Sequence, residues 1–181
     1  MSPLQILGFL FDFYISIVLL RLLLQVTRAD FYNPLSQFCV RLTQPVLAPL
    51  RRIIPGFGGI DLASLLFAFV LVTIKIIVLV RLGAGVWPSV IAVLLRSVFE
   101  LTLASLQLMF WLVVVRAILS WVDTYGASPV ARVLSQLTDP LLRPVRRVIP
   151  PIGGLDLSPM ALILLILLAQ WAVGRLMLGS W

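Results

Sequence analysis

Four apolar stretches, each near the length of a membrane-spanning helix, limit what this chain can fold into. They cover residues 4–26, 62–82, 101–122 and 160–178. An α-helix needs roughly 20 residues to cross a hydrocarbon layer of about 30 Å, and it pairs its backbone N–H and C=O groups within one segment. Only 12% of the residues are charged, against about 25% in a soluble domain. The sequence therefore predicts an all-α integral membrane protein with four transmembrane helices.

A shift of 95 residues aligns the second half of the sequence with the first half without a gap. The residues in register include Arg21 with Arg116, Pro45 with Pro140, Pro49 with Pro144, Pro55 with Pro150, Gly58-Gly59 with Gly153-Gly154, and Asp61 with Asp156. Chance does not keep so many prolines, glycines and charged residues in register. We therefore predict two copies of one helix–loop–helix unit.

The duplicated unit fixes the predicted domain organisation. The first repeat covers 1–82 with its loop at 28–61, the second covers 99–181 with its loop at 123–156, and residues 83–98 join them. Each repeat has two spans, so both enter the membrane in the same orientation, unlike the inverted repeats of many transporters. Both loops are then expected on the same side of the membrane. The loops hold eight arginines and the opposite side three, which predicts cytoplasmic loops and both termini on the outer side.

The first part of each loop has the pattern of an amphipathic helix. Asn33-Pro34 and Ser128-Pro129 are typical pairs of an N-cap and a first helical residue. Apolar residues follow at helical spacing, at 35, 38, 39, 42 and 46 and again at 130, 133, 134, 137 and 141. We predict a helix in the membrane interface. It is expected to end near Gln44 and Asp139, because the residue before a proline is driven out of the helical region.

The end of each loop gathers arginines, prolines and glycines. The arginines are Arg51, Arg52, Arg143, Arg146 and Arg147. We expect the guanidinium groups to suit phosphate oxygens, the prolines to hold the backbone extended, and the paired glycines to allow a tight turn. Asp61 or Ser158 is expected to cap the helix that follows. Two interpretations stay open: a stiff hairpin that only fixes topology, or a docking surface for an anionic ligand or protein partner. An ion pair from Arg51 or Arg52 to Asp61 fits both.

Polar side chains recur inside the predicted spans. Asp12 and Lys75 lie about 12 Å and about 10 Å from the outer ends of their spans at the rise of an α-helix. The shift of 95 residues maps them onto Gln107 and Gln170. We predict an Asp12–Lys75 ion pair and a Gln107–Gln170 hydrogen bond, because a charge at this depth is costly unless it is paired. Such pairs join helices; an ion or proton path, or snorkelling of the charges to water, are the alternatives.

Two further features leave alternatives open. Arg21 and Arg116 lie about one turn from the inner ends of their spans, where snorkelling to the interface is the simplest expectation. Contact with a lipid phosphate or with the partner loop is the alternative. Residues 88–100 form either another interfacial helix or an extension of the third span, and Arg96 and Glu100 are spaced to pair on a helix.

The residue types that most enzymes and metal sites need are scarce. The sequence has no histidine and one cysteine, Cys39, so it supports neither a disulfide within the chain nor a zinc site. It has no nucleophile–base pair and no carboxylate cluster, and we predict a non-enzymatic protein without cofactors. Cys39 falls on the apolar stripe, which favours an inert buried thiol. Membrane topology explains the net charge of +7, and no direct nucleic acid contact is expected.

The doubled pattern P-[VL]-L-x-P-[LV]-R-R-[IV]-I-P-x-[FI]-G-G-[IL]-D-L resembles the YggT family of bacterial membrane proteins, called YlmG in other lineages. The resemblance covers about residues 4–178 and implies a four-span protein of the bacterial inner membrane. It also implies roles linked to osmotic stress tolerance and ion uptake, or, in plastid and cyanobacterial relatives, to haem attachment and nucleoid or division organisation. The first repeat has Ala48 and Ser64 where the second has Arg143 and Pro159.

These features predict an organising or assembly factor that acts through basic cytoplasmic loops at the lipid headgroups. The expected partners are anionic phospholipids, an unidentified membrane protein and further copies of the chain. The alternative function is a small ion channel or transport component in potassium or osmotic regulation. That alternative requires an oligomer, because four spans leave little room for a pore within one chain.

Overall fold

The computed structural model describes residues 2–56, 59, 61–122, 128–149 and 156–179. Pro150 and the glycines Gly58, Gly153 and Gly154, to which the sequence assigned loop geometry, lie outside these residues. The described chain forms six α-helices. They are α1 (Pro3–Val26), α2 (Pro34–Ile53), α3 (Leu62–Ala84), α4 (Val90–Val122), α5 (Pro129–Val148) and α6 (Ser158–Gly179).

Four of these helices, α1, α3, α4 and α6, are long and apolar enough to cross a membrane. This confirms the all-α class and the four predicted spans. The longest helix, α4, has 33 residues and begins at Val90, so the segment before the third predicted span extends that span. Arg96 Nε donates to Glu100 Oε1 at 2.9 Å on this extension, as the spacing predicted. At about 1.5 Å per residue α4 exceeds the hydrocarbon thickness, which favours a tilted or protruding helix.

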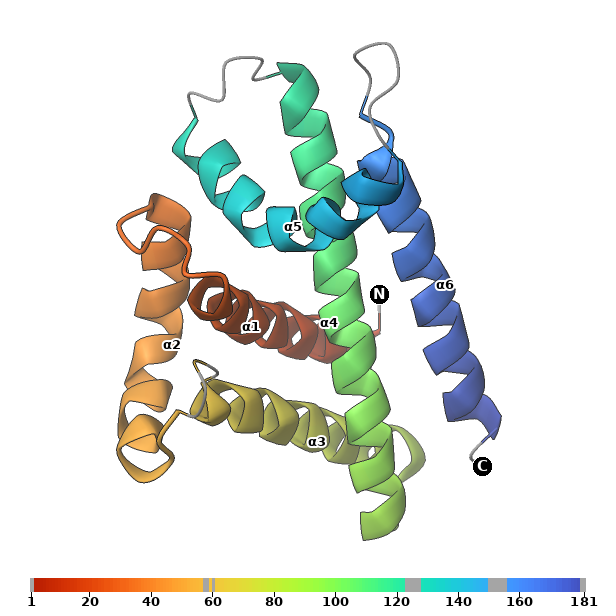
Figure 1. Ribbon diagram of the computed structural model, residues 1–181. Helices are drawn as coiled ribbons and strands as arrows, with labels where there is room; N and C mark the ends of the chain where they lie inside the picture. Colours follow the sequence, from red (N-terminus) through yellow and green to blue (C-terminus); the bar gives the residue numbers. More distant parts are fainter. Residues whose placement is uncertain (1, 57–58, 60, 123–127, 150–155, 180–181) are drawn as a thin grey trace.

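Each repeat packs its two spans as an antiparallel pair. Figure 1 shows α1 beside α3 and α4 beside α6, with the two pairs crossing one another. The loop helices lie across the ends of their own pairs, and α2 contacts α5. Asn33 Nδ2 donates to the carbonyl of Pro129 at 2.6 Å, and the Asp30 N–H donates to Gln136 Oε1 at 2.9 Å. The two loops therefore lie side by side, as an even number of spans in each repeat predicts.

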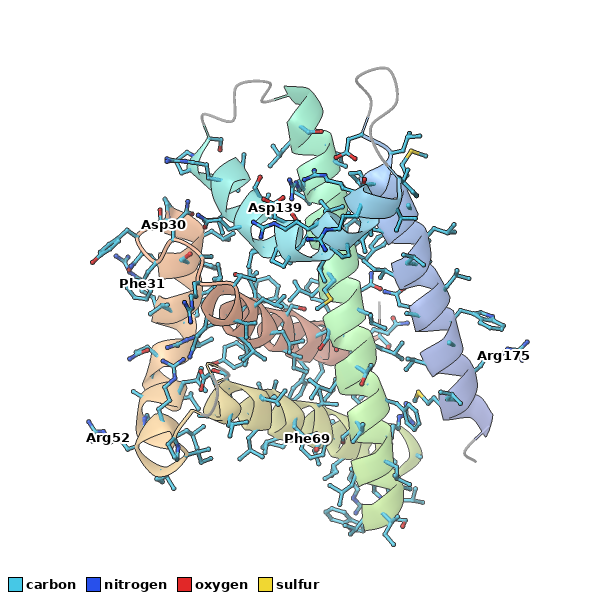
Figure 2. All side chains as sticks on the ribbon, viewed as in Figure 1. Asp30, Phe31, Arg52, Phe69, Asp139 and Arg175 are labelled. Atoms are coloured by element: carbon cyan, nitrogen blue, oxygen red, sulfur yellow. The ribbon has the colours of Figure 1, made fainter. Side chains whose placement is uncertain are left out.

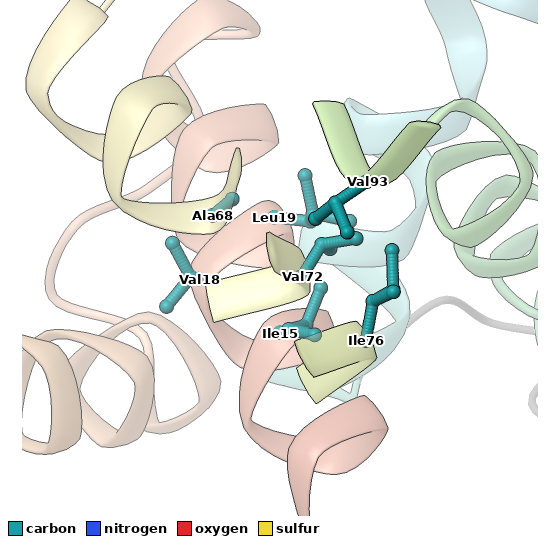
Figure 3. Close-up of a cluster of buried hydrophobic side chains, with 7 residues drawn as sticks. All are labelled: Ile15, Val18, Leu19, Ala68, Val72, Ile76 and Val93. Carbon is teal, nitrogen blue, oxygen red and sulfur yellow. The ribbon is translucent and has the colours of Figure 1, made fainter. Parts of the chain in front are cut away.

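Buried apolar side chains join the spans and then join the two repeats. Figure 3 shows the cluster between α1, α3 and the beginning of α4, in which Ile15, Val72 and Val93 meet. In lipid such packing rests on close contact of side chains, and small residues such as Ala68 allow the helices to approach. A second cluster contains residues of both repeats. Its members are Ile17, Leu24, Cys39, Leu112, Val133, Leu134 and Leu137.

The prediction that the loop helices end near Gln44 and Asp139 is wrong. Both continue through two internal prolines each, to Ile53 and Val148. A proline inside a helix removes one hydrogen bond and strains the turn before it. Pro45 and Pro49, like Pro140 and Pro144, are exposed and four residues apart, so the missing bonds fall on the outer face. The inner face keeps its packing through the fully buried Leu47 and Leu142. These four prolines therefore do not hold the backbone extended, whereas the backbone before Pro55 is extended, as predicted. Figure 1 shows α5 bent.

The two loop helices use their apolar stripes differently. In α5 most of the predicted stripe is buried, including Val133, Leu134 and Leu137. In α2 only Cys39 of the predicted stripe is buried, together with Ser36, Thr43 and Leu47. Leu35 of the stripe is half-buried, and Phe38, Leu42 and Val46 are exposed. An exposed apolar face is what a helix in the membrane interface requires, so the interfacial prediction fits α2 more directly than α5.

Substitutions of Asn33 test the contact between the two loops. Asn33 caps α2 by accepting from the Leu35 N–H at 3.0 Å, and its amide also donates to Pro129. We expect Asn33→Ala to lower the free energy of unfolding by about 1–2 kcal/mol, because it removes both bonds. Asn33→Asp keeps the capping oxygen and should cost less. Thermal unfolding of the protein in detergent measures both. An Asn33→Asp variant as stable as the unmodified protein would show that the bond between loops adds no stability.

Candidate functional site

Arg21 is buried against its own loop helix. Its side chain leaves α1, and only 5% of the residue is exposed. Nη1 donates to Thr43 Oγ1 at 2.5 Å, and Nη2 donates to Gln44 Oε1 at 2.6 Å. The Thr43 hydroxyl itself donates to the Cys39 carbonyl, which leaves its lone pairs for the guanidinium. The expectation that Arg21 snorkels is therefore wrong, because α2 folds over the end of α1 and covers it.

Arg116 makes the equivalent contact in the second repeat. Its Nη1 donates to Thr138 Oγ1 at 2.6 Å and lies 2.7 Å from Asp139 Oδ1. The arginine is therefore held by α5, and snorkelling is wrong here too. Sequence reasoning did not single out Thr43 or Thr138, although the 95-residue shift places them in register. That register was the signal that could have found them.

A second arginine of each loop helix holds the helix to the following span. Arg51 Nε donates to Asp61 Oδ2 at 3.0 Å, and Arg146 Nε donates to Asp156 Oδ2 at 2.9 Å. The Arg51–Asp61 pair predicted from the sequence is thus present. We call these contacts, together with those of Arg21 and Arg116, the two-point clamp. It joins each loop helix to both spans of its repeat, with the planar guanidinium supplying several donors to each contact.

The two clamp aspartates also begin the spans that follow them. Asp61 is the N-cap of α3 and accepts from the Ser64 N–H at 3.2 Å, as the sequence predicted. Asp156 accepts from the Ser158 N–H at 3.0 Å at the beginning of α6. The Ser158 hydroxyl donates to the carbonyl of Ile149 at 3.4 Å. Each aspartate thus connects a helix N-terminus to an arginine of the loop helix.

The clamp aspartates are ionised at neutral pH. Burial alone raises the pKa of Asp61, but hydrogen bonds from Ser64 and Arg51 outweigh it and bring the pKa below the ordinary 3.8. The same balance lowers the pKa of Asp156, with Ser158 and Arg146 as the donors. Both ion pairs are therefore intact at neutral pH, and the stability they contribute is lost only as the pH falls below the ordinary carboxylate range.

The two neighbouring arginines of each loop have different surroundings. The first members, Arg51 and Arg146, are half-buried in the clamp. The second members, Arg52 and Arg147, are exposed, and so is Arg143. Figure 2 shows Arg52 pointing away from the helices at the end of α2. Of the five arginines predicted to bind lipid or a partner, the three exposed ones remain available for that role.

The intramembrane pairs predicted from the sequence are both present. Lys75 Nζ lies 2.8 Å from Asp12 Oδ1, and Gln170 Nε2 donates to Gln107 Oε1 at 3.2 Å. The pairs join α1 to α3 and α4 to α6. The sequence missed a third member, because Lys75 Nζ also lies 2.9 Å from Glu100 Oε2 on α4. Glu100 reaches Lys75 only because the two pairs of spans cross. The sequence spacing predicted a single partner for Glu100, namely Arg96 on the same helix.

A cavity of about 400 Å³ opens at this charged cluster. Its polar lining comes from Asp12, Lys75, Glu100 and Gln107. It lies where α1, α3, α4 and α6 meet, and its remaining wall is largely apolar. The two carboxylates and one ammonium make it the most strongly charged region that the described residues place inside the spans.

The remaining loop residues have structural surroundings. Gly59 has a positive φ of 85°, a conformation that favours glycine, and Pro55 lies in the non-helical segment after α2. Cys39 is 1% exposed, and burial raises the pKa of its thiol to about 11. The thiol is therefore protonated at neutral pH, in agreement with the expected inert side chain. The described residues contain no group of three or more side chains suited to hold a metal ion.

Comparison with known proteins decides the family. The model of the CCB3/YggT family matches two tandem segments of this chain, residues 2–82 and 95–177. This protein belongs to the CCB3/YggT family. Among its relatives, the "Uncharacterized protein in proC 3'region" of Vibrio alginolyticus is 49% identical over 95% of this chain and 93% of its own length. The "Uncharacterized protein YggT" of Escherichia coli K12 is 44% identical over 92% and 86%. No solved structure matches.

The clamp aspartates give the sharpest test of the site. Asp61→Asn removes a buried carboxylate and leaves the half-buried Arg51 without its anion, so we expect the free energy of unfolding at neutral pH to fall by about 3 kcal/mol. Asp156→Asn should cost less, because 33% of the Asp156 side chain is exposed against 3% for Asp61. The measurement is Tm in detergent. Asp30→Asn, an exposed carboxylate outside the clamp, is the control.

The same variants have a defined pH dependence. Because the folded pKa of both aspartates is lowered, their contribution is present above the ordinary value of 3.8 and is lost as the pH falls through the folded value. The difference in Tm between the unmodified protein and Asp61→Asn should therefore shrink as the pH approaches about 2. A difference that stays constant over that range would contradict the ionised clamp.

Proposed function

We propose that this CCB3/YggT protein is a non-catalytic organising or assembly factor of the bacterial inner membrane. Its loops face the cytoplasm in this proposal, and they bind anionic headgroups and a membrane-protein partner. The observation that carries the proposal is the arrangement of the double arginines. Arg51 and Arg146 hold the loop helices, whereas Arg52, Arg143 and Arg147 stay exposed on them.

Physical chemistry favours this use of the exposed arginines. A basic residue near an anionic leaflet gains about 1 kcal/mol, and a guanidinium binds carboxylate or phosphate through paired donors. The clamp lowers the conformational freedom of the backbone that carries these arginines, so less entropy is lost when a partner binds. The exposed apolar side chains of α2, Phe38 and Leu42 among them, are suited to the same interface.

A site-specific photo-crosslinking experiment tests the proposal. Ile53 and Val148 follow the exposed arginines directly and are 79% and 81% exposed, so a crosslinking amino acid there samples what those arginines contact. We expect discrete protein adducts from both positions in cells, and their loss when Arg52→Gln and Arg147→Gln are added. Leu176, exposed on α6, is the control position. Adducts that persist without the two arginines would overturn the proposal.

Protein stability separates recruitment from folding in this experiment. Arg52→Gln with Arg147→Gln should leave Tm within about 1 °C of the unmodified protein, because exposed substitutions away from packed features change stability little. Arg51→Gln with Arg146→Gln should lower Tm clearly, because both residues belong to the clamp. The exposed pair therefore reports on binding and the clamp pair on folding.

A second candidate function is a small oligomeric ion channel or transport component, in line with the osmotic link implied by the family. The observation that favours it is the charged cluster of Asp12, Lys75 and Glu100 at a cavity among the spans. Ionisable groups inside a membrane frequently mark ion or proton pathways. In this proposal the oligomer supplies the pore, and the cluster lines it.

Potassium flux into liposomes tests the transport candidate. If the cluster lines a path, purified protein should carry a flux that falls at least about tenfold in Lys75→Gln, because the ammonium holds both carboxylates in place. Asp30→Asn, outside the spans, should leave the flux unchanged. Liposomes that show no flux above the protein-free background would remove this candidate.

A further inference from the structure

A cavity of about 410 Å³ lies in the first repeat, where the end of α1 meets α2. Three arginines line it: Arg21, Arg28 and Arg51. Its other walls come from four apolar residues and two polar ones. They are Leu24, Gln25, Ala29, Phe31, Ser36 and Val40. The volume is in the range of ligand cavities, roughly 300–1,000 Å³.

The cavity carries more positive charge than the described residues neutralise. Arg51 is paired with Asp61, which also accepts from Ser64. Arg21 is almost fully buried, yet its two hydrogen bonds go to the neutral oxygens of Thr43 and Gln44. No carboxylate of the described residues forms an ion pair within 4.0 Å of Arg21. A buried charge without a counter-charge is costly, and two of the five N–H donors of this guanidinium are accounted for.

The second repeat supplies the missing anion from its own sequence. Asp139 occupies the position of Gln44 after the shift of 95 residues. Its Oδ1 lies 2.7 Å from Arg116 Nη1 and 3.6 Å from Arg146 Nη1, so one carboxylate bridges both clamp arginines. Figure 2 shows Asp139 in the middle of α5, over the spans. Arg28 also corresponds in sequence to an aspartate, Asp123, which lies outside the described residues.

We propose that the cavity of the first repeat binds a phosphate group, and that Asp139 replaces this ligand in the second repeat. A phosphate offers several oxygen acceptors to guanidinium groups that converge from different helices. The cavity lies at the end of α1, one of the four helices long and apolar enough to cross a membrane, and Leu24 and Phe31 add an apolar wall. Lipid headgroups lie beside the ends of such helices. The phosphate therefore belongs to an anionic phospholipid headgroup or to free phosphate, and the experiment below separates the two sources.

This inference rests on the proposed function in one respect, namely that the loops face anionic headgroups. It assigns a different set of residues, since the proposed recruitment uses the exposed arginines and the phosphate site uses the lining of the cavity. Arg28 is the accessible member of that lining. Its backbone has a positive φ of 52°, at the position after the α1 C-cap where glycine is the usual residue.

Two substitutions that change charge test the site. Gln44→Glu places a carboxylate beside Arg21, as Asp139 does beside Arg116, and should displace the ligand. Arg28→Gln removes one of the lining cations. In native mass spectrometry of the detergent-solubilised protein, we expect each variant to bind phosphatidylglycerol about tenfold more weakly, the effect of losing one charge-assisted hydrogen bond. The control is Arg41→Gln, which removes an exposed arginine of α2 that does not line the cavity.

The source of the phosphate follows from three probes: phosphatidylglycerol, phosphatidylcholine and inorganic phosphate. Preferential retention of phosphatidylglycerol that inorganic phosphate does not displace identifies a lipid headgroup, whereas displacement at millimolar phosphate identifies the free anion. Equal binding of phosphatidylglycerol by the unmodified protein, Gln44→Glu and Arg28→Gln would overturn the site. The crosslinks at Ile53 and Val148 are read separately, so failure of this site and failure of the proposed recruitment are distinguishable.

Stability without lipid gives an independent readout. Gln44→Glu should raise Tm in lipid-free detergent, because the new carboxylate contacts Arg21 directly, whereas Asp61 acts on Arg21 only from beyond 4.0 Å. Asp139→Asn should lower Tm, and added phosphatidylglycerol should restore part of the loss by entering the equivalent position. If Gln44→Glu has the same Tm as the unmodified protein and the same gain from added lipid, Arg21 needs no anion and the proposal fails.

Discussion

Guanidinium groups fix the position of both loop helices relative to the membrane spans. A helix that lies across the end of a hairpin has no covalent reason to stay there, and its apolar face alone does not define its rotation. In each repeat, one arginine of the preceding span binds the loop helix. One arginine of the loop helix binds the aspartate at the beginning of the following span. The exposed arginines, the cavity in the first repeat and the contact between the loops all depend on this placement.

The repeat register accounts for much of what the sequence predicted correctly. It supported the pairing of Asp12 with Lys75 and of Gln107 with Gln170, whereas the four spans followed from the length of the apolar stretches. These features are local to one repeat, where helical rise and the 95-residue shift determine depth and neighbours. The pairing of Arg51 with Asp61 was found for the same reason, because few residues separate them.

The features that sequence reasoning missed depend on packing between elements. Burial of Arg21 follows from α2 covering the end of α1, and the contact of Glu100 with Lys75 follows from the crossing of the repeats. The helices continue past Gln44 and Asp139 because their prolines lie on the outer face, whereas the rule for prolines considers only the local backbone. Periodicity within one segment contains none of this information.

The buried cluster that contains Cys39, Leu112 and Leu134 has an evolutionary consequence. Each repeat contributes side chains to it, so a chain with a single repeat would leave an apolar surface uncovered. By pairing with a second copy of itself, such a half-length ancestor could pack that surface against protein in place of lipid. Gene duplication would then have joined the two halves of a dimer into one polypeptide. Once joined, the halves were free to diverge, and one could acquire a carboxylate at a position where the other kept a neutral amide.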